Sequence, residues 1–342
     1  MKISIGYKVQ QGPWGGGNGF YAGLIQYLQT AGYQVVQNLD DDDIDIILVT
    51  DPRRRNNAIP FTYNAAWRYA RYKNPSCLLV HRINECDERK NTNSMNRLLK
   101  QCNAVMDHTV FVGTWLKELD LWQGIEKMPY SVILNGSDSN IFNSVGLKPW
   151  TGDGPLKLIT HHWGGNWMKG FDIYQRLDQM LAEDKWRGRI EFSYMGNLPV
   201  GFQFNNTTFI EPKSGKDLAD ELRNHHAYVT GSIGEPGGNH QNEGAQCGLP
   251  VLFLRSGCMT EYLDEYGVGY NSIINFEEEL EKLLRNYTYW QKKITSYPNT
   301  LKATCLSWET LFLDLFRNRE ELISLRAKRE TFDFRLRHRF SL

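Results

Sequence analysis

One stretch of the chain, residues 227–254, constrains the fold more strongly than any other. It opens with a short apolar run at 227–230, which predicts a buried strand, and a glycine-rich loop that carries Glu235 follows. A short helix is expected next, with Glu243 near its start, and residues 251–254 predict the following strand. A strand, a loop, a helix and a strand in this order form the unit in which a helix N-terminus binds a negatively charged ligand.

The two glutamates of this stretch are separated by seven residues and permit two interpretations. Acidic residues are favoured in the first turn of any helix, so Glu235 and Glu243 could be a solvated loop residue and an ordinary helix-start residue. The adjacent glycines Gly237 and Gly238, and the Gly-Leu-Pro-Val run at 248–251, favour a ligand site instead. In this interpretation both carboxylates lie between two short buried strands.

The pattern resembles the E-x7-E signature of retaining glycosyltransferases with the GT-B fold, and most closely that of family 4. The resemblance implies that Glu235 faces the donor sugar and that Glu243 holds the ribose hydroxyls of the nucleotide. It also implies that the donor is bound along Gly237, Gly238 and Asn239, which lie between the two glutamates.

The first half of the chain alternates predicted strands with predicted helices. Strands are expected at residues 2–7, 33–36, 44–49 and 77–83, with helices at 20–30 and 62–73. This alternation predicts an α/β fold built on a parallel, doubly wound sheet. The resemblance implies two such Rossmann-like domains that face each other across a cleft.

A segment rich in glycine and proline, residues 143–155, predicts the linker between the two domains. The chain of 342 residues is long enough for two domains. We therefore expect an N-terminal, acceptor-side domain at residues 1–148 and a nucleotide-sugar domain at 149–310. The resemblance implies that the last helix and the basic tail, residues 311–342, cross back to the first domain.

A second match to the family precedes this linker. Asn135, Gly136, Asp138 and Phe142 have the spacing N-G-x-D-x-x-x-F after a predicted strand. In the family this segment closes the first domain. The resemblance implies a structural role at the junction of the two domains.

A glycine-rich segment follows the first predicted strand and includes Gly15, Gly16 and Gly17. Glycines let the backbone approach a phosphate closely with its N–H groups. The segment resembles the family-4 loop that reaches the donor's pyrophosphate from the acceptor domain, which makes these glycines donor-binding candidates. A merely flexible loop is the alternative.

The same segment also fits part of the dinucleotide-binding fingerprint. Gly17, Gly19 and Ala22 have its spacing, and Asp40 lies downstream at a suitable distance. That fingerprint normally opens soon after its strand, whereas Gly17 lies ten positions after Tyr7. An NAD(P)-dependent dehydrogenase is therefore the second hypothesis.

Lys169 and the glycine that follows it precede a predicted helix and resemble the family's K-G motif, in which the lysine meets the donor phosphates. A lysine at a helix start is mildly unfavourable for the helix dipole, so a bound anion would explain it. The family usually has an arginine five or six positions earlier, where this chain has Gly164 and Trp163. Asn166 or His162 could donate a hydrogen bond instead. This departure keeps a third hypothesis open, a catalytically silent protein that binds nucleotide sugars.

Two further sets of residues complete the predicted site. Gly196 ends the strand expected at 189–195 and resembles the family's glycine turn near the nucleotide. On the acceptor side, Asn84 and Asp87 follow the strand at 77–83, where open α/β sheets place ligands. An ordinary charged loop is the alternative for this second set.

Composition restricts the partners and the compartment. The formal net charge is zero, so no nucleic-acid partner is expected. No apolar run approaches the length of a membrane-spanning helix, and six scattered cysteines without a C-x-x-C pair favour a reducing cytoplasm. The basic segment 326–339 predicts either peripheral contact with a membrane surface or partner, or a packed amphipathic terminus. His161 and His162 lack a suitably spaced third ligand, so no metal is expected.

The resemblance implies transfer of a sugar from a UDP- or GDP-linked donor to a hydroxyl of a glycan, a lipid-linked glycan or a glycoprotein. The resemblance implies retention of the anomeric configuration and no cofactor. Glu235 and Lys169 are the expected catalytic residues, because one orients the donor sugar and the other stabilises charge on the leaving diphosphate. Backbone amides of Gly15, Gly16 and Gly17 would add to that stabilisation.

Overall fold

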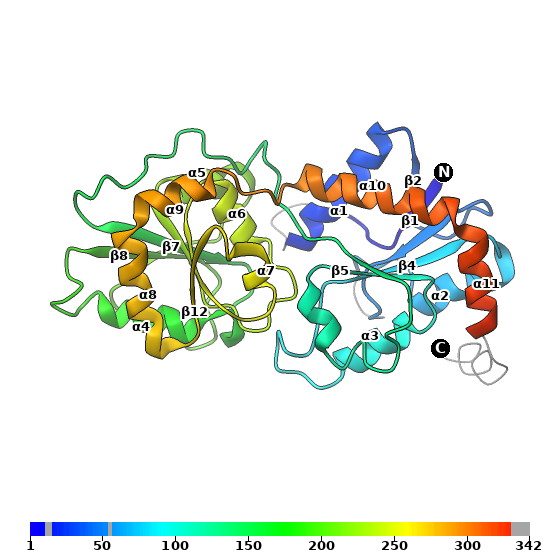
Figure 1. Cartoon of the computed structure of the whole chain (residues 1–342), viewed down its shortest axis with the longest axis horizontal. Helices are drawn as coiled ribbons and strands as arrows, with labels where there is room; N and C mark the ends of the chain where they lie inside the picture. The colour runs from blue at the N-terminus through cyan, green and yellow to red at the C-terminus, as the bar shows by residue number, and fades with distance from the viewer. Residues whose placement is uncertain (11–15, 54–56, 330–342) are drawn as a thin grey trace.

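The chain folds into two halves, each built on its own six-stranded parallel sheet (Figure 1). The structure is a computed structural model that describes residues 1–10, 16–53 and 57–329. Both sheets are wholly parallel, and helices alternate with their strands. The predicted fold class of two doubly wound, Rossmann-like domains is confirmed.

The first sheet has the strand order β2-β1-β3-β4-β5-β6. Its strands are β1 (Lys2–Ile5), β2 (Gln34–Val36), β3 (Ile46–Val49), β4 (Leu78–Ile83), β5 (His108–Phe111) and β6 (Tyr130–Val132). Its helices are α1 (Gly16–Thr30), α2 (Tyr63–Arg68) continued by a π-helical turn (Tyr69–Lys73), α3 (Met95–Asn103) and a 3-10 turn (Thr114–Glu118). Every residue of β3, β4 and β5 is buried, as expected of parallel strands covered by helices on both faces.

The second sheet has the order β12-β11-β10-β7-β8-β9. Its strands are β7 (Leu156–His162), β8 (Ile190–Gly196), β9 (Thr208–Ile210), β10 (Ala227–Thr230), β11 (Val251–Leu254) and β12 (Gly267–Tyr270). Its helices are a 3-10 turn (Trp167–Lys169), α4 (Phe171–Met180), α5 (Gly215–Arg223), α6 (His240–Gln246), α7 (Met259–Leu263), α8 (Ile273–Arg285) and α9 (Tyr287–Ile294). This is the strand order of dinucleotide-binding folds, and the winding reverses between β7 and β10.

The last two helices, α10 (Leu301–Arg317) and α11 (Arg319–Arg329), return to the first half (Figure 1). Trp308 and Phe312 of α10 share a buried cluster with Phe20 of α1. Residues 301–310, which we assigned to the second domain, therefore lie in a helix that packs against α1 of the first domain.

The chain crosses back beside the segment that follows β6. Leu301 N–H donates to the carbonyl of Ser137 at 2.8 Å. A Cβ added to Gly136 would lie 2.3 Å from the carbonyl carbon of Thr300, so only glycine fits this crossing. The side chain of Asn135 donates to the Gly237 carbonyl at 2.6 Å, which links the same segment to the second domain.

Three local expectations differ from the structure. Helix α1 begins at Gly16 instead of residue 20, so Gly16 and Gly17 form the first turn of a helix, and Gly15 lies outside the described residues. Strand β12 was not expected, because Gly267 and Gly269 weaken its strand pattern. Of the predicted basic segment 326–339, only the first four residues are described, and they end α11. Among the described helices, none is long and apolar enough to cross a membrane.

Candidate functional site

The two strands between which the second sheet reverses, β7 and β10, lead into loops that carry the predicted donor-binding residues. The loop after β7 leads to Lys169, and the loop after β10 leads to Glu235. The two loops touch, because the Ile233 N–H donates to the Met168 carbonyl at 2.8 Å. Ligands of open α/β sheets bind at this position, beyond the carboxyl ends of the strands.

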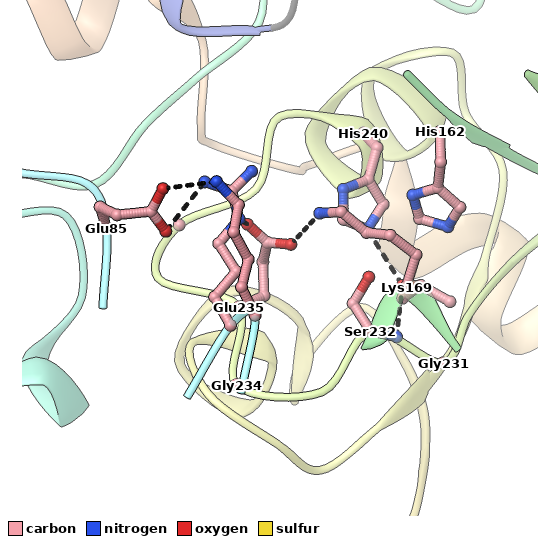
Figure 2. Close-up of polar contacts among 12 residues, drawn as sticks. Glu85, His162, Lys169, Gly231, Ser232, Gly234, Glu235 and His240 are labelled. Carbon is pink, nitrogen blue, oxygen red and sulfur yellow. Dashed lines mark hydrogen bonds and ion pairs between the residues drawn. The ribbon is translucent and has the colours of Figure 1, made fainter. Parts of the chain in front are cut away.

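Lys169 and Glu235 form an ion pair at this edge (Figure 2). Lys169 Nζ lies 2.5 Å from Glu235 Oε2. Only 7% of the lysine and 3% of the glutamate are exposed. Gly170 follows the lysine with φ of 99°, a left-handed conformation that suits glycine, and the chain then enters α4. The structure thus brings together the two residues that we predicted separately as catalytic.

The carboxyl of Glu235 is ionised at neutral pH. Burial alone would raise the pKa of the Glu235 carboxyl. The positive charges of Lys169 and Arg89 outweigh this effect and lower the pKa to about 2. Burial lowers the pKa of Lys169, and the Glu235 carboxylate opposes that shift. Replacing a buried ion pair by apolar residues is often neutral or stabilising, so stability alone does not explain this pair. Its position at the ligand-binding edge favours a functional explanation.

The second glutamate of the signature, Glu243, lies in α6. Its Oε2 is 2.7 Å from Nε2 of His161, near the end of β7. The hydroxyl of Tyr228 lies 3.1 Å from the other ring nitrogen, Nδ1. With the tyrosine donating to Nδ1, Nε2–H donates to the carboxylate, which fixes both the ring and Glu243. We had not foreseen His161 as a partner, because no local pattern joins it to a residue in α6.

Two further histidines lie beside Lys169 (Figure 2). The rings of His162 and His240 have centroids 4.6 Å apart. His162 Nε2 is 2.7 Å from the Tyr174 hydroxyl, and His240 Nε2 is 3.0 Å from the Thr230 hydroxyl. Burial holds the pKa of both histidines well below its usual value, so both are neutral at pH 7. Among the described residues no group of His, Cys, Asp and Glu side chains has the arrangement of a metal site.

Several buried polar atoms in the loops after β7 and β10 and in the first turn of α6 lack a hydrogen-bond partner within the described part of the chain. They are Asn166 Oδ1, Ser232 Oγ, Asn239 Oδ1, and both Nε2 and Oε1 of Gln241. Ser232 and Gln241 are fully buried. Buried polar groups are normally satisfied, so this concentration indicates a place for a polar ligand. Ser232 is a candidate that the sequence did not mark.

Asn239 connects this site to the first domain. Its Nδ2 donates to the Gly16 carbonyl at 2.9 Å. A Cβ on Gly16 would lie 2.6 Å from the same nitrogen, whereas a Cβ on Gly17 would meet nothing within 4 Å. Both glycines belong to the first turn of α1, whose free N–H groups and dipole favour an anion. The structure therefore places Asn239 against Gly16, with Gly17 next to it in the same turn, and their binding of a donor stays a prediction.

The remaining predicted glycines make close backbone contacts. At Gly237 an added Cβ would lie 2.6 Å from Val112 Cγ2, and at Gly238 it would lie 2.5 Å from Gln241 Oε1. At Gly196 it would lie 2.0 Å from the carbonyl oxygen of His162. Gly196 also has φ of 131°. Gly237 and Gly196 therefore require glycine for packing, whereas the atoms close to Gly238 belong to side chains; direct contact with a donor remains a prediction.

The acceptor-side expectation for Asp87 is corrected. Its carboxylate accepts hydrogen bonds from the N–H groups of Ser94, Met95 and Asn96, at 2.9–3.0 Å, and from the Thr92 hydroxyl. Burial opposes ionisation, but these hydrogen bonds lower the pKa of Asp87. The side chain caps the N-terminus of α3 and has no capacity left for an acceptor.

Asn84 keeps a position at the junction of the domains. Its Oδ1 lies 3.5 Å from Nδ2 of Asn135, which contacts the donor-side loop through Gly237. The sequence did not mark Arg89, a cation of the same first-domain loop. Its Nε lies 3.6 Å from Glu235 Oε1.

Comparisons with known proteins identify the fold. The sequence matches no protein-family model and no curated protein. A sucrose-phosphate synthase from Thermosynechococcus elongatus is similar with a TM-score of 0.64 at 13% identity, over 92% of this chain and 98% of that chain. HepE from Anabaena, in complex with UDP and glucose, has a TM-score of 0.61 at 12% identity, over 91% and 99%. A glycosyltransferase from Rickettsia africae has a TM-score of 0.63 at 12% identity, over 93% and 98%. At these identities the similarity shows the fold alone, which is GT-B.

Proposed function

We propose that this chain is a retaining glycosyltransferase that moves a sugar from a nucleoside-diphosphate sugar to an acceptor hydroxyl. The observation that carries the proposal is the buried Lys169–Glu235 pair, at the edge where the second sheet reverses its winding. A fixed carboxylate beside an ammonium group suits a substrate that presents sugar hydroxyls next to phosphates. The similar structures include a synthase and a glycosyltransferase, which supports this class of reaction.

The proposed mechanism assigns one task to each member of the pair. Glu235 accepts hydrogen bonds from the donor sugar and fixes its orientation. When the bond from the anomeric carbon to the diphosphate oxygen breaks, that oxygen gains negative charge. Lys169 has three N–H donors, so it can contact a phosphate oxygen while it stays paired with Glu235. The N-terminus of α1, at Gly16 and Gly17, adds further stabilisation of the leaving group.

We also propose a nucleotide, an acceptor class and a compartment. Glu243, held by His161, binds the ribose hydroxyls of a UDP- or GDP-linked donor. The presence of UDP and glucose in the HepE structure supports the uridine donor. The acceptor is a glycan, a lipid-linked glycan or a glycoprotein, with Asn84 on its side of the site, and the reaction needs no metal. A reducing cytoplasm suits the six cysteines, which are all buried and unpaired.

One observation favours a second candidate, a protein that binds nucleotide sugars without catalysis. The loop after β7 places Trp163 and Gly164 where the resembled family has an arginine, so this loop offers Lys169 alone as a cation. The dehydrogenase hypothesis has no comparable support. β1 ends at Ile5 and α1 begins only at Gly16, which differs from the tight turn of a dinucleotide fingerprint.

A donor screen tests the proposal. UDP-, GDP- and ADP-sugars are added to the purified chain, and the unfolding midpoint and the release of free sugar are both measured. One donor class should raise the midpoint, with about 2.7 kcal/mol of stabilisation at one hundred times its dissociation constant. Binding with neither hydrolysis nor transfer to any acceptor would favour the silent binder. Failure of every donor to bind would contradict the proposal.

Gln241 should respond to substitution with opposite effects on stability and on donor binding. Both ends of its buried amide lack partners within the described residues. We expect Gln241→Met to raise the free energy of unfolding by about 1 kcal/mol, because it removes unpaired buried polar atoms. The same substitution should weaken donor binding about tenfold, since a hydrogen bond to the donor is lost. Urea unfolding and donor titration measure the two effects.

Gln246 on the same helix is the matched control. Its Nε2 already donates to the Tyr297 carbonyl at 3.3 Å. Gln246→Met should therefore lower stability and leave the donor titration unchanged. A Gln241→Met variant that binds donor as tightly as the wild-type chain would remove Gln241 from the site.

A further inference from the structure

We infer that Arg89, which belongs to the first domain, supplies the second positive charge for the donor's diphosphate. The inference rests on the proposed function and deepens it, because it assigns a phosphate-binding residue that no sequence motif marked. It also means that residues from both domains form the diphosphate site.

The geometry places Arg89 on the far side of Glu235 from Lys169. Arg89 Nε lies 3.6 Å from Glu235 Oε1, and Lys169 Nζ lies 2.5 Å from Glu235 Oε2. Within the described residues, these are the two cations that pair with this carboxylate. Figure 2 shows Glu235 between Glu85, on the first-domain side, and Lys169.

The charges at this position require a second cation. Lys169 and Glu235 cancel each other, and the neighbouring His162 and His240 are neutral because burial lowers the pKa of each. A nucleoside diphosphate brings about two negative charges or more at neutral pH. Without Arg89, the described part of the site would offer that charge the already paired Lys169 and the N-terminus of α1. An arginine presents five N–H donors in a planar fork that matches phosphate oxygens.

The loop that carries Arg89 is fixed against the donor loop. The Cys86 thiol lies 3.6 Å from the Gly234 carbonyl oxygen. A Cβ on Gly234, which has φ of 58°, would lie 2.9 Å from the carbonyl carbon of Glu88. The backbone of Glu88, the residue before Arg89, is therefore in direct contact with the backbone of Gly234, the residue before Glu235.

Arg89 also retains capacity for a ligand. Its Nε is buried and has no hydrogen-bond partner in the described part of the chain. Its Nη1 lies 3.5 Å from Glu85 Oε1, but Glu85 also pairs with Lys90 at 3.0 Å and with Arg53 at 3.7 Å. Arg53 is held mainly by Asp51, so Glu85 serves Arg89 and Lys90 together and only partly neutralises Arg89.

Titration of nucleotides against matched variants tests the inference. The variants are Arg89→Ala and Arg89→Lys, with Lys90→Ala as the control that removes another partner of Glu85. The probes are UDP, GDP and ADP, each compared with its own nucleoside. We expect Arg89→Ala to weaken binding of the recognised diphosphate by roughly tenfold to a hundredfold and to leave the nucleoside unchanged. Arg89→Lys should recover part of the loss, and Lys90→Ala should match the wild-type chain.

Each other outcome has a defined meaning. Equal diphosphate affinity in Arg89→Ala and wild type would overturn the inference and leave the proposed function intact. An equal loss for nucleoside and diphosphate would assign Arg89 to structural support of Glu235 and would also overturn it. A wild-type chain that binds none of the diphosphates would refute the proposed function, and the inference with it. Arg89→Lys, which keeps the charge, supplies a folded comparison if Arg89→Ala unfolds.

Discussion

The Glu235→Gln variant is expected to transfer sugar about a hundredfold to a thousandfold more slowly than the wild-type chain. Glutamine keeps the size of the side chain, and its amide oxygen can still accept from Lys169, so the variant should fold. It loses the negative charge that holds Lys169 and Arg89 on opposite sides and that accepts hydrogen bonds from the donor sugar. The measurement is donor turnover at saturating donor, corrected for the folded fraction.

Glu277 is a matched control because its carboxyl is equally acidic. The hydrogen bond from Arg176 lowers the pKa of Glu277 to about 2, with help from Lys185, although burial opposes the shift. It lies on α8, whereas the candidate site is built at the ends of β7 and β10. Glu277→Gln should lower stability and leave turnover unchanged. Equal turnover in the Glu235 and Glu277 variants would refute the role assigned to Glu235.

The strands around Glu235 were predictable because their signals are local. The apolar runs at 227–230 and 251–254 coincide with β10 and β11. Gly231 ends the first run and Pro250 precedes the second, and short apolar segments next to such residues form buried strands in parallel sheets. These local patterns therefore predicted the α/β class, the resemblance supplied the two-domain arrangement, and the sequence marked the signature glutamates individually.

The partners of those glutamates were not predictable, because each partner comes from a distant part of the chain. Lys169 and His161 reach Glu235 and Glu243 only once β7 and β10 pair in the second sheet. Arg89 reaches Glu235 only when the two domains meet. No spacing within the sequence encodes a contact that tertiary packing creates.

Asp87 shows why a polar residue after a strand is an ambiguous signal. Carboxylates that bind ligands and carboxylates that cap helices both occur at the ends of strands and the starts of helices. The N–H groups of Met95 and Asn96 in α3 decide this case, because they occupy the Asp87 oxygens.

Lys169→Met is expected to lower the free energy of unfolding by about 3 kcal/mol or more. The substitution leaves the buried carboxylate of Glu235 with Arg89 alone, 3.6 Å away. In the wild-type chain, the lowered pKa of Glu235 adds stability at pH values above its unfolded pKa of about 4.3. That contribution is lost as the pH falls toward about 2. Urea unfolding between about pH 3 and pH 7, a range around that unfolded pKa, measures the effect. The free energy of unfolding should depend less on pH in Lys169→Met than in the wild-type chain.

The double variant Lys169→Met with Glu235→Leu separates a functional pair from a stabilising one. Removing both charges also removes the cost of burying them, so the double variant should recover at least half of the stability that Lys169→Met loses. It should nevertheless show no donor turnover, because both proposed catalytic groups are absent. Stability losses that simply add would mean that Lys169 and Glu235 do not interact in solution. A fully stable double variant without activity would show that the pair is retained for its chemistry, at some expense of the stability that an apolar site would provide.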